Sequence, residues 1–159
     1  MQVSHNFAIF ARTKTTTMAR YKEYGYDIQD GKAIIPEWET EIKEEAFWGC
    51  EELTSVEFPQ WIKKIEKEAF WGCWNLTEIT LPEWVDEIGE YAFDACDGLR
   101  YITINATAPP YLNGSMHSYD YTFPNNGCPI YVPAESVDAY KAESRWLVYK
   151  NRIYPIPNE

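Results

Sequence analysis

Residues 36–104 of this 159-residue chain read PEWETEIKEEAFWGCEELTSVEF (36–58), PQWIKKIEKEAFWGCWNLTEITL (59–81) and PEWVDEIGEYAFDACDGLRYITI (82–104). The three segments each have 23 residues and align without a gap. A fixed period of this size is typical of a repeat architecture. The residues that recur in equivalent positions are Pro36/Pro59/Pro82, Trp38/Trp61/Trp84, Ile42/Ile65/Ile88, Phe47/Phe70/Phe93, Cys50/Cys73/Cys96 and Leu53/Leu76/Leu99.

Each repeat predicts a short strand near its end. A unit of this length cannot bury its apolar face alone, so neighbouring units must stack and share one core. In the first copy Val56 and Phe58 alternate with Ser55 and Glu57, which is the period of a strand with one face inward. Stacking then gives one strand per repeat in a parallel sheet. The compact Ala-Phe-x-x-Cys run predicts a tight helical or 3₁₀ turn on the opposite side.

Residues 21–35 predict an N-terminal hairpin cap. Asp30-Gly31 stands between two extended runs, and both turn positions need a positive φ, which is a strong hairpin signal. Ala33 has the register of Val56, so the hairpin is expected to supply the first strand of the stack. Such a cap shields a sheet edge that would otherwise pair with other chains.

The period ends at Ile104, and residues 105–159 predict a loop followed by a C-terminal cap. The loop is rich in Pro and Asn-Gly turns, and aromatic residues such as Phe123 predict that part of it packs on the core. Ile130–Pro133 repeat the strand ending and should add one more strand. Further expected elements are a short helix over 136–143 with Val137, Tyr140 and Trp146–Leu147 along one face, and an extended end with Ile153 and Ile156. The expected organisation is one structural domain over 21–159, preceded by a flexible arm over residues 1–20.

The repeat resembles the BspA-like leucine-rich repeats, which read C-x-x-L-x-x-I-x-L-P-x-x-V-x-x-I-G-x-x-A-F-x-x-C. One copy meets this pattern at Cys50, Leu53, Val56, Phe58, Pro59, Ile62, Ile65, Ala69, Phe70 and Cys73, and the next at Leu76, Ile79, Leu81, Pro82, Val85, Ile88, Gly89, Ala92, Phe93 and Cys96. The tail resembles the C-terminal cap of these proteins at Ala108-Pro109-Pro110, Ile130-Tyr131-Val132-Pro133, Tyr140 and Trp146. The resemblance implies a leucine-rich-repeat solenoid and a non-catalytic role in binding or adhesion, and it names no ligand. With the two caps, the predicted fold class is an α/β-type repeat solenoid with a parallel β-sheet, an N-terminal hairpin cap and a helix-containing C-terminal cap.

The net charge of −11 argues against nucleic acids and anionic membranes as partners, because both require clustered Lys and Arg. No apolar run approaches the roughly 20 residues of a membrane-spanning helix, so membrane insertion is not expected. The apolar patch at residues 7–11 is shorter than the core of a secretory signal. Proteins of the resembled family are often exported. We therefore expect either a processed form or a protein that works inside the cell.

Three of the four cysteines form one repeat column, Cys50, Cys73 and Cys96. Stacking places equivalent side chains parallel and about 5 Å apart, whereas a disulfide needs Cβ atoms about 3.8 Å apart with converging directions. These residues are therefore expected to be buried thiols that pack as small apolar groups. Cys128 stands outside the column. Without a C-x-x-C motif, the cysteines carry no zinc or redox signature.

Enzymatic function has little support in the sequence. His5 and His117 lie in stretches with no regular framework, while a catalytic triad needs a base that a third group orients. Carboxylates are abundant but fall on the predicted outer faces, where charges keep a repeat protein soluble. Neither a cofactor nor a metal is expected. A Ca²⁺ site between neighbouring acidic rows is a less favoured alternative.

Tryptophan supplies the first candidate binding surface. Trp38, Trp61 and Trp84 follow the strand, where relatives commonly carry serine or glycine, and Trp48 and Trp71 occupy the variable site inside Ala-Phe-x-x-Cys. Both columns are expected to point outward and to stack as aromatic ladders. Stacking could serve stability alone, whereas contiguous exposed indoles mark recognition surfaces. Asp94 replaces tryptophan in the third copy of the second column, which favours Trp38, Trp61 and Trp84 as the functional row.

The outer face of the predicted sheet is the second candidate surface, because repeat proteins commonly bind along it. Its residues are expected to be Ser55, Glu57, Glu78, Thr80, Tyr101 and Thr103. With three full repeats the face is short, which favours a peptide, a loop or a short glycan over a large wrapped partner. The first functional hypothesis is a protein-binding module, the second is a carbohydrate-binding or adhesive module, and the third is an enzyme. A monomer is the default expectation.

Overall fold

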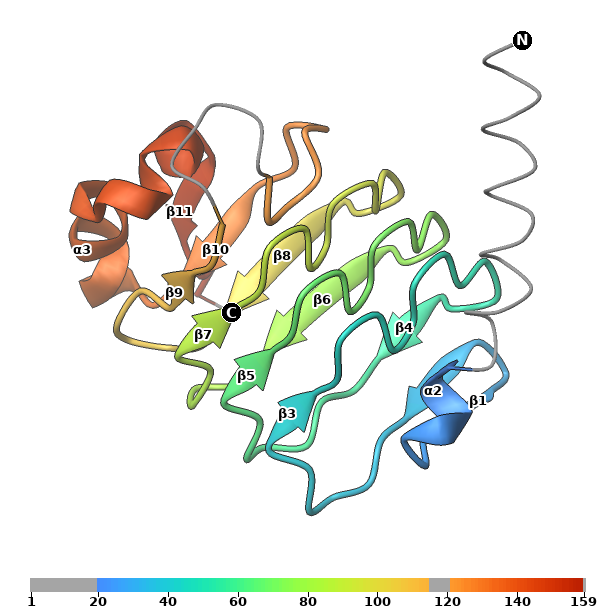
Figure 1. Ribbon diagram of the computed structural model, residues 1–159. Helices are drawn as coiled ribbons and strands as arrows, with labels where there is room; N and C mark the ends of the chain where they lie inside the picture. Colours follow the sequence, from blue (N-terminus) through green and yellow to red (C-terminus); the bar gives the residue numbers. More distant parts are fainter. Residues whose placement is uncertain (1–19, 115–120, 159) are drawn as a thin grey trace, which may run out of the picture.

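The computed structural model describes residues 20–114 and 121–158, which form a stack of repeats with a cap at each end (Figure 1). The predicted arm over residues 1–20 falls almost wholly outside these ranges. His5 and His117 also lie outside the described residues.

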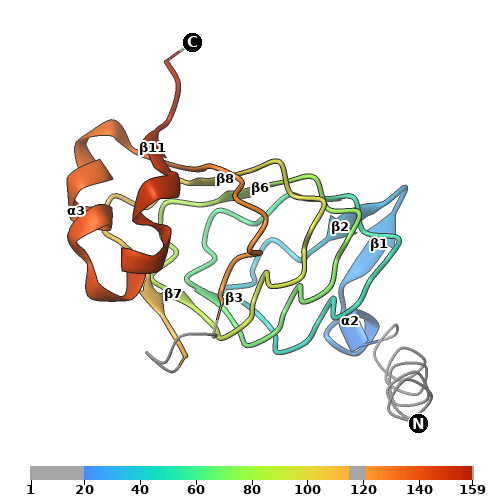
Figure 2. The same ribbon diagram turned by 90° about the horizontal axis from the view of Figure 1, so that it is seen from above.

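Each repeat contributes two short strands, so the prediction of one strand per repeat was wrong. The expected strands are β4 (Ser55–Val56), β6 (Glu78–Leu81) and β8 (Tyr101–Ile104). The additional strands are β3 (Glu41–Ile42), β5 (Lys64–Ile65) and β7 (Glu87–Ile88), which lie along the opposite side of the stack (Figures 1 and 2). Two residues are too short for an alternating pattern to be recognised in the sequence.

The period of 23 residues is the register of both parallel sheets. Ile42 pairs with Ile65, and Ile65 pairs with Ile88, in the sheet of order β3-β5-β7-β9. In the sheet of order β11-β10-β8-β6, Ile79 pairs with Ile102. Beyond the repeats the sheets continue through β9 (Tyr111–Leu112), β10 (Ile130–Val132) and β11 (Ile153–Pro155). The predicted additional strand at Ile130 is therefore confirmed.

The Ala-Phe-x-x-Cys segments form the predicted tight turns, closed by i→i−3 hydrogen bonds such as that from Cys50 N to Phe47 O at 3.1 Å, but they form no continuous 3₁₀ helix. A helix does not continue because alternate amides donate to carbonyls of the next repeat instead. Phe47 N donates to Ala69 O at 2.7 Å, and Phe70 N donates to Ala92 O at 2.8 Å. Left-handed φ values of 62° at Gly49, 71° at Gly72 and 56° at Ala95 turn the chain at equivalent positions.

The N-terminal end carries the expected hairpin. Strands β1 (Asp27–Gln29) and β2 (Lys32–Ile34) pair antiparallel, and Asp30 and Gly31 both have positive φ values, 49° and 78°. Ala33 pairs with Val56 of β4, as predicted. A helical turn, α2 (Arg20–Glu23), precedes the hairpin.

Strand β4 belongs to the hairpin sheet, of order β1-β2-β4, and is not hydrogen-bonded to β6 in a common sheet. The expected continuous sheet is therefore divided between the first and second repeats. Phe58 stands where the next repeats have Leu81 and Ile104. Its larger ring stays half-buried and packs edge-on against Phe70 at 5.7 Å, and β4 ends before reaching it.

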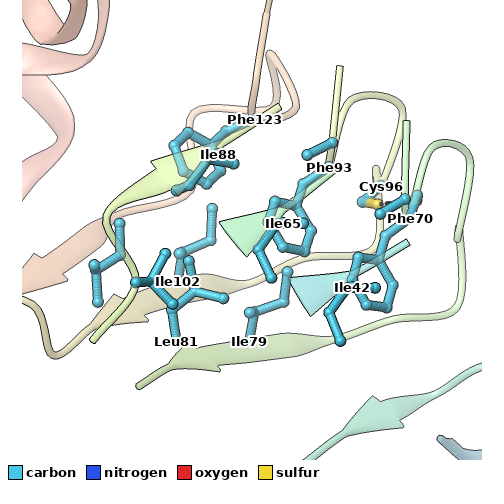
Figure 3. Packing of buried hydrophobic residues seen from close by; sticks show 14 of the residues in the cluster. Ile42, Ile65, Phe70, Ile79, Leu81, Ile88, Phe93, Cys96, Ile102 and Phe123 are labelled. Carbon is cyan, nitrogen blue, oxygen red and sulfur yellow. Dashed lines mark hydrogen bonds between the residues drawn. The ribbon is translucent and has the colours of Figure 1, made fainter. Parts of the chain in front are cut away.

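Phenyl rings from successive repeats form one continuous stack, here called the phenyl file, through the core of the molecule. Phe47, Phe70 and Phe93 are fully buried, with centroids 5.2 Å apart at each step and ring planes within 9° of parallel. Figure 3 shows Phe70, Phe93 and Phe123 beside a second file of Ile42, Ile65 and Ile88. Tyr21 and Tyr26 close the phenyl file at one end, with centroids 5.5 and 5.8 Å from Phe47. The repeats and both caps thus share one core.

The C-terminal cap contains η1 (Ala134–Ser136), α3 (Val137–Ala142) and η2 (Ser144–Arg152). Tyr140 and Trp146 are fully buried. The Tyr140 hydroxyl donates to Ala106 O at 2.7 Å, and Trp146 Nε1 donates to Pro110 O at 2.9 Å. Leu147, expected on the same inward face, is 49% exposed because η2 is a 3₁₀ helix with a different period.

Candidate binding surfaces

Trp38, Trp61 and Trp84, here called the tryptophan row, lie at the tips of three equivalent turns. In each turn the backbone amide of the residue after tryptophan donates to the carbonyl of the preceding proline, at 3.0, 3.2 and 3.3 Å. The three side chains are 79%, 53% and 52% exposed. A turn tip points away from the core, which explains why three large apolar side chains face water.

Backbone hydrogen bonds hold these turns in register. Lys63 N donates to Thr40 O at 2.7 Å, and Asp86 N donates to Lys63 O at 2.8 Å. The backbones of successive turns are therefore spaced by about the inter-strand distance of 4.8 Å. Among the described residues no ring-stacking contact joins these three indoles, so the expected stacked ladder is not formed here.

Trp48 and Trp71 form a pair of a different kind. Their rings stack with centroids 4.8 Å apart and planes 16° from parallel, and both are half-buried. The Trp48 side chain is hydrogen-bonded to Glu68, and that of Trp71 is hydrogen-bonded to Asp94. The predicted stacking is confirmed for this pair, but the rings are half-buried and not exposed as expected.

The two carboxyl groups that accept from these indoles are partly removed from water. Burial is the largest effect on each, and it raises the pKa of Glu68 and of Asp94 above the ordinary values. Asp94 occupies the position of Trp48 and Trp71 in the third repeat and ends the stack by accepting from the last ring. This column thus has a structural explanation in the hydrogen bonds it makes.

The predicted sheet-face residues are divided by the break between β4 and β6. Ser55 lies on β4 and Glu57 just beyond it, where Glu57 forms an ion pair with Lys32. On the larger sheet, Glu78 and Thr80 are exposed on β6, and Tyr101 and Thr103 are half-buried on β8. The Tyr101 hydroxyl donates to Glu78. The structure brings the last four together on one face.

Two further residues extend that face and were missed from the sequence. Tyr131 on β10 lies 6.2 Å from Tyr101, and Tyr154 on β11 lies 6.5 Å from Tyr131, measured between ring centroids. We call Tyr101, Tyr131 and Tyr154 the tyrosine row. The signal was present, because Ile130-Tyr131-Val132 and Ile153-Tyr154-Pro155 both place tyrosine between residues that a strand turns the other way.

All four cysteines are free and buried, which confirms the interpretation of the repeat column as core thiols. Cys73 Sγ donates to Phe47 O, and Cys96 Sγ donates to Phe70 O, each at 3.0 Å. Burial raises the pKa of Cys50 to about 11 and that of Cys73 well above its usual range. Cys128 packs beside Arg152, whose Nε donates to Cys128 O at 2.8 Å. The three thiols of the repeat column therefore pack in the core.

Neither a metal centre nor a membrane span is found in the part of the chain that the structure describes. Within residues 20–114 and 121–158, no group of three or more His, Cys, Asp or Glu is arranged to hold a metal ion. The calcium alternative therefore gains no support there. In the same ranges no helix is both long and apolar enough to cross a bilayer.

The family model described as "BspA type Leucine rich repeat region (6 copies)" matches residues 26–119, more than half of the chain. No curated protein matches the chain. The matched region contains the hairpin, all three repeats, and both the tryptophan row and Tyr101 of the tyrosine row.

Proposed function

Since this chain belongs to the BspA-type leucine-rich repeat family, we propose that it is a non-catalytic binding module. In this proposal it is a capped leucine-rich-repeat solenoid that engages a protein or peptide through the tryptophan row. Residues 21–35 serve as the N-terminal cap, 36–104 as the repeats and 105–159 as the loop and C-terminal cap of one structural domain.

The observation that carries the proposal is the contrast between the two tryptophan columns. Trp48 and Trp71 stack on each other and donate to carboxylates, so their presence is accounted for by the fold. The tryptophan row is more than half exposed, and its rings make no stacking contact among the described residues. Three aligned indoles in water cost free energy that burial against a partner would recover. Tryptophan is also enriched among the residues that dominate binding energy.

A capture experiment with matched variants tests this proposal. The full chain and its Trp38→Ala/Trp61→Ala/Trp84→Ala variant are immobilised in equal amounts and exposed to extract from the source cells. Trp48→Ala serves as the control, since it removes a half-buried ring from the other column. Circular dichroism establishes that each variant is folded. A partner captured by the wild type and the control, but lost with the triple variant, supports the proposal; equal capture by all three contradicts it.

Carbohydrate binding or adhesion is the second candidate function, and the tyrosine row favours it. Tyr101, Tyr131 and Tyr154 line one face beside the hydroxyl groups of Thr80 and Thr103. Aromatic faces suit the apolar side of a sugar ring, and neighbouring hydroxyls suit its polar edge. A glycan array that gives a signal with the wild type, and loses it with Tyr131→Ala, would favour this function over the first.

A further inference from the structure

The tryptophan row lies in a strongly acidic neighbourhood. Within two residues of the three indoles, the chain places Glu37, Glu39, Glu83 and Asp86 against a single cation, Lys63. Glu37, Glu83 and Asp86 are exposed, and so is Lys63. The whole chain has a net charge of −11, so the net charge around the tryptophan row has the same sign as that of the whole molecule.

Some carboxylates on the surface are paired with a cation of the same chain, and others are not. Glu41, Glu57, Glu87 and Glu90 each lie within 4 Å of a lysine nitrogen. Glu39 is 4.0 Å from Lys43. Among the described residues, no salt bridge includes Glu37, Glu83 or Asp86. Three carboxylates beside three exposed indoles are therefore available to a cation supplied by another molecule.

The chemistry of this combination is selective. The face of an indole attracts a cation through its ring quadrupole, more strongly than the faces of tyrosine or phenylalanine. A guanidinium or ammonium group can then contact both an indole face and a carboxylate, which an acidic or neutral side chain cannot do. The row spans two inter-strand spacings, about 10 Å, a length that an extended chain covers in about three residues.

We propose that the tryptophan row docks an extended, lysine- and arginine-rich segment of a partner protein, with cationic side chains against Trp38, Trp61 and Trp84 and between Glu37, Glu83 and Asp86. This inference rests on the proposed function and gives the chemical class of its partner. Indole faces supply the contact area, and the unpaired carboxylates select for positive charge. Nucleic acids and anionic membranes are negatively charged, as this surface is, and are therefore repelled by it.

Titration with synthetic peptides of about eight residues tests the charge requirement. Calorimetry with the full chain compares a Ser-Arg repeat, a Ser-Lys repeat and a Ser-Glu repeat. We expect binding of the first two, weakened by added salt, and no binding of the third. Binding of the Ser-Glu peptide as tight as that of the Ser-Arg peptide overturns the proposal.

The essential control separates this site from general attraction to an acidic protein. The Trp38→Ala/Trp61→Ala/Trp84→Ala variant keeps the net charge, so diffuse attraction would remain. We expect the Kd for the Ser-Arg peptide to rise about 10- to 100-fold in this variant, from the loss of three cation–π contacts. Glu37→Gln/Glu83→Gln should also weaken binding, whereas Glu57→Gln, which removes a carboxylate already paired with Lys32, should change it little. Unchanged affinity in the triple tryptophan variant overturns the proposal.

The two proposals fail in different ways. If a captured partner depends on the tryptophan row but has no basic segment, the proposed binding function is supported and the proposal of a basic segment is contradicted. Loss of all row-dependent capture removes both.

Discussion

Phe93 and Phe123 stack with ring centroids 5.9 Å apart and ring planes 5° from parallel, although 30 residues separate them. Phe70 and Phe93, one period apart, stack at 5.2 Å with the same 5° angle. The backbone follows the same rule, since Phe93 N donates to Thr122 O at 2.8 Å as Phe70 N donates to Ala92 O. The segment after the loop therefore takes the place of a fourth repeat turn and covers the last ring.

Removal of a ring from the middle of this file should be costly. Phe70 is fully buried between Phe47 and Phe93, so Phe70→Ala leaves a cavity as well as losing apolar burial. We expect the free energy of unfolding to fall by about 3–5 kcal/mol, measured by urea denaturation. Trp61→Ala, at 53% exposure, should change it far less. Similar losses for the two variants would contradict the assignment of core and surface.

The turn at Ala95 offers a stabilising substitution. Ala95 has a φ of 56°, and the equivalent residues of the preceding repeats are glycines. A side chain in the left-handed region costs about 1–2 kcal/mol, so Ala95→Gly should raise the free energy of unfolding by about 1 kcal/mol. The mirror variant, Gly72→Ala, should lower it by a similar amount. Its new Cβ would lie 3.6 Å from Gly49 Cα, an ordinary contact, so strain alone would be measured.

The thiol column should be unreactive in the folded protein. Thiolate is the form that attacks a disulfide reagent, and burial raises the pKa of Cys50 to about 11 and that of Cys73 well above its usual range. At pH 8 a chromogenic disulfide should titrate almost no thiol in the native protein, and four per chain in denaturant. A native protein that reacts at once with two or more equivalents would show that the column is open to solvent.

The Asp94 carboxyl predicts a specific pH dependence. Burial raises its pKa in the folded protein, so the folded state binds this proton more tightly than the unfolded chain does. Ionisation of this carboxyl therefore lowers the stability of the folded protein. The loss is absent at low pH, grows as pH rises from the ordinary aspartate pKa towards the raised one, and is complete at neutral pH. Asp94→Asn should therefore gain stability relative to wild type as pH rises from about 3 to 7, while asparagine can still accept from Trp71.

Glu57 provides a control of opposite sign. Lys32 lowers the pKa of Glu57 by a hydrogen bond and by charge. The stability that ionised Glu57 contributes is therefore present above the ordinary glutamate pKa and is lost as pH falls. Glu57→Gln should lose stability relative to wild type as pH rises over the same range. Urea denaturation at several pH values measures both differences, and slopes of equal sign would contradict the assignment.

Repetition made much of the fold predictable from sequence. The columns in register identify Ile65, Phe70 and Cys73 as core residues, because a side chain repeated at a fixed period must occupy the same position in each unit. The hairpin was equally accessible, since Asp30-Gly31 specifies a turn that few other dipeptides adopt. The hairpin follows from local chemistry alone, and the core columns follow from comparison of the three repeats.

Features that depend on contacts between units were less accessible. Strands as short as Lys64–Ile65 form only because the neighbouring repeat supplies hydrogen-bond partners. The half-burial of Trp48 depends on Trp71 and Glu68 of the next repeat. Tyr131 and Tyr154 join Tyr101 only because the later part of the chain places β10 beside β8 and β11 beside β10. Of the candidate surfaces, the sequence located the tryptophan row but not the tyrosine row.

The claim on which the account depends is that residues 23 positions apart occupy equivalent places in stacked units. Two deletion variants that differ by a single residue test it. Deletion of residues 56–78 removes one full period and leaves Leu53-Thr54-Ser55-Ile79-Thr80-Leu81, which restores the repeat. Deletion of residues 57–78 leaves Val56 beside Ile79, so that the strand has one residue too many and the apolar side chains on one side of it must face outward.

Urea denaturation of these two deletion variants is the most direct measurement. The account predicts that the chain without residues 56–78 retains a single cooperative transition, because Phe47 then stacks on Phe93 in place of Phe70. The chain without residues 57–78 should be clearly less stable or unfolded. Equal stability of the two chains, or a fully unfolded chain after removal of the exact period, would contradict the stacked-repeat account.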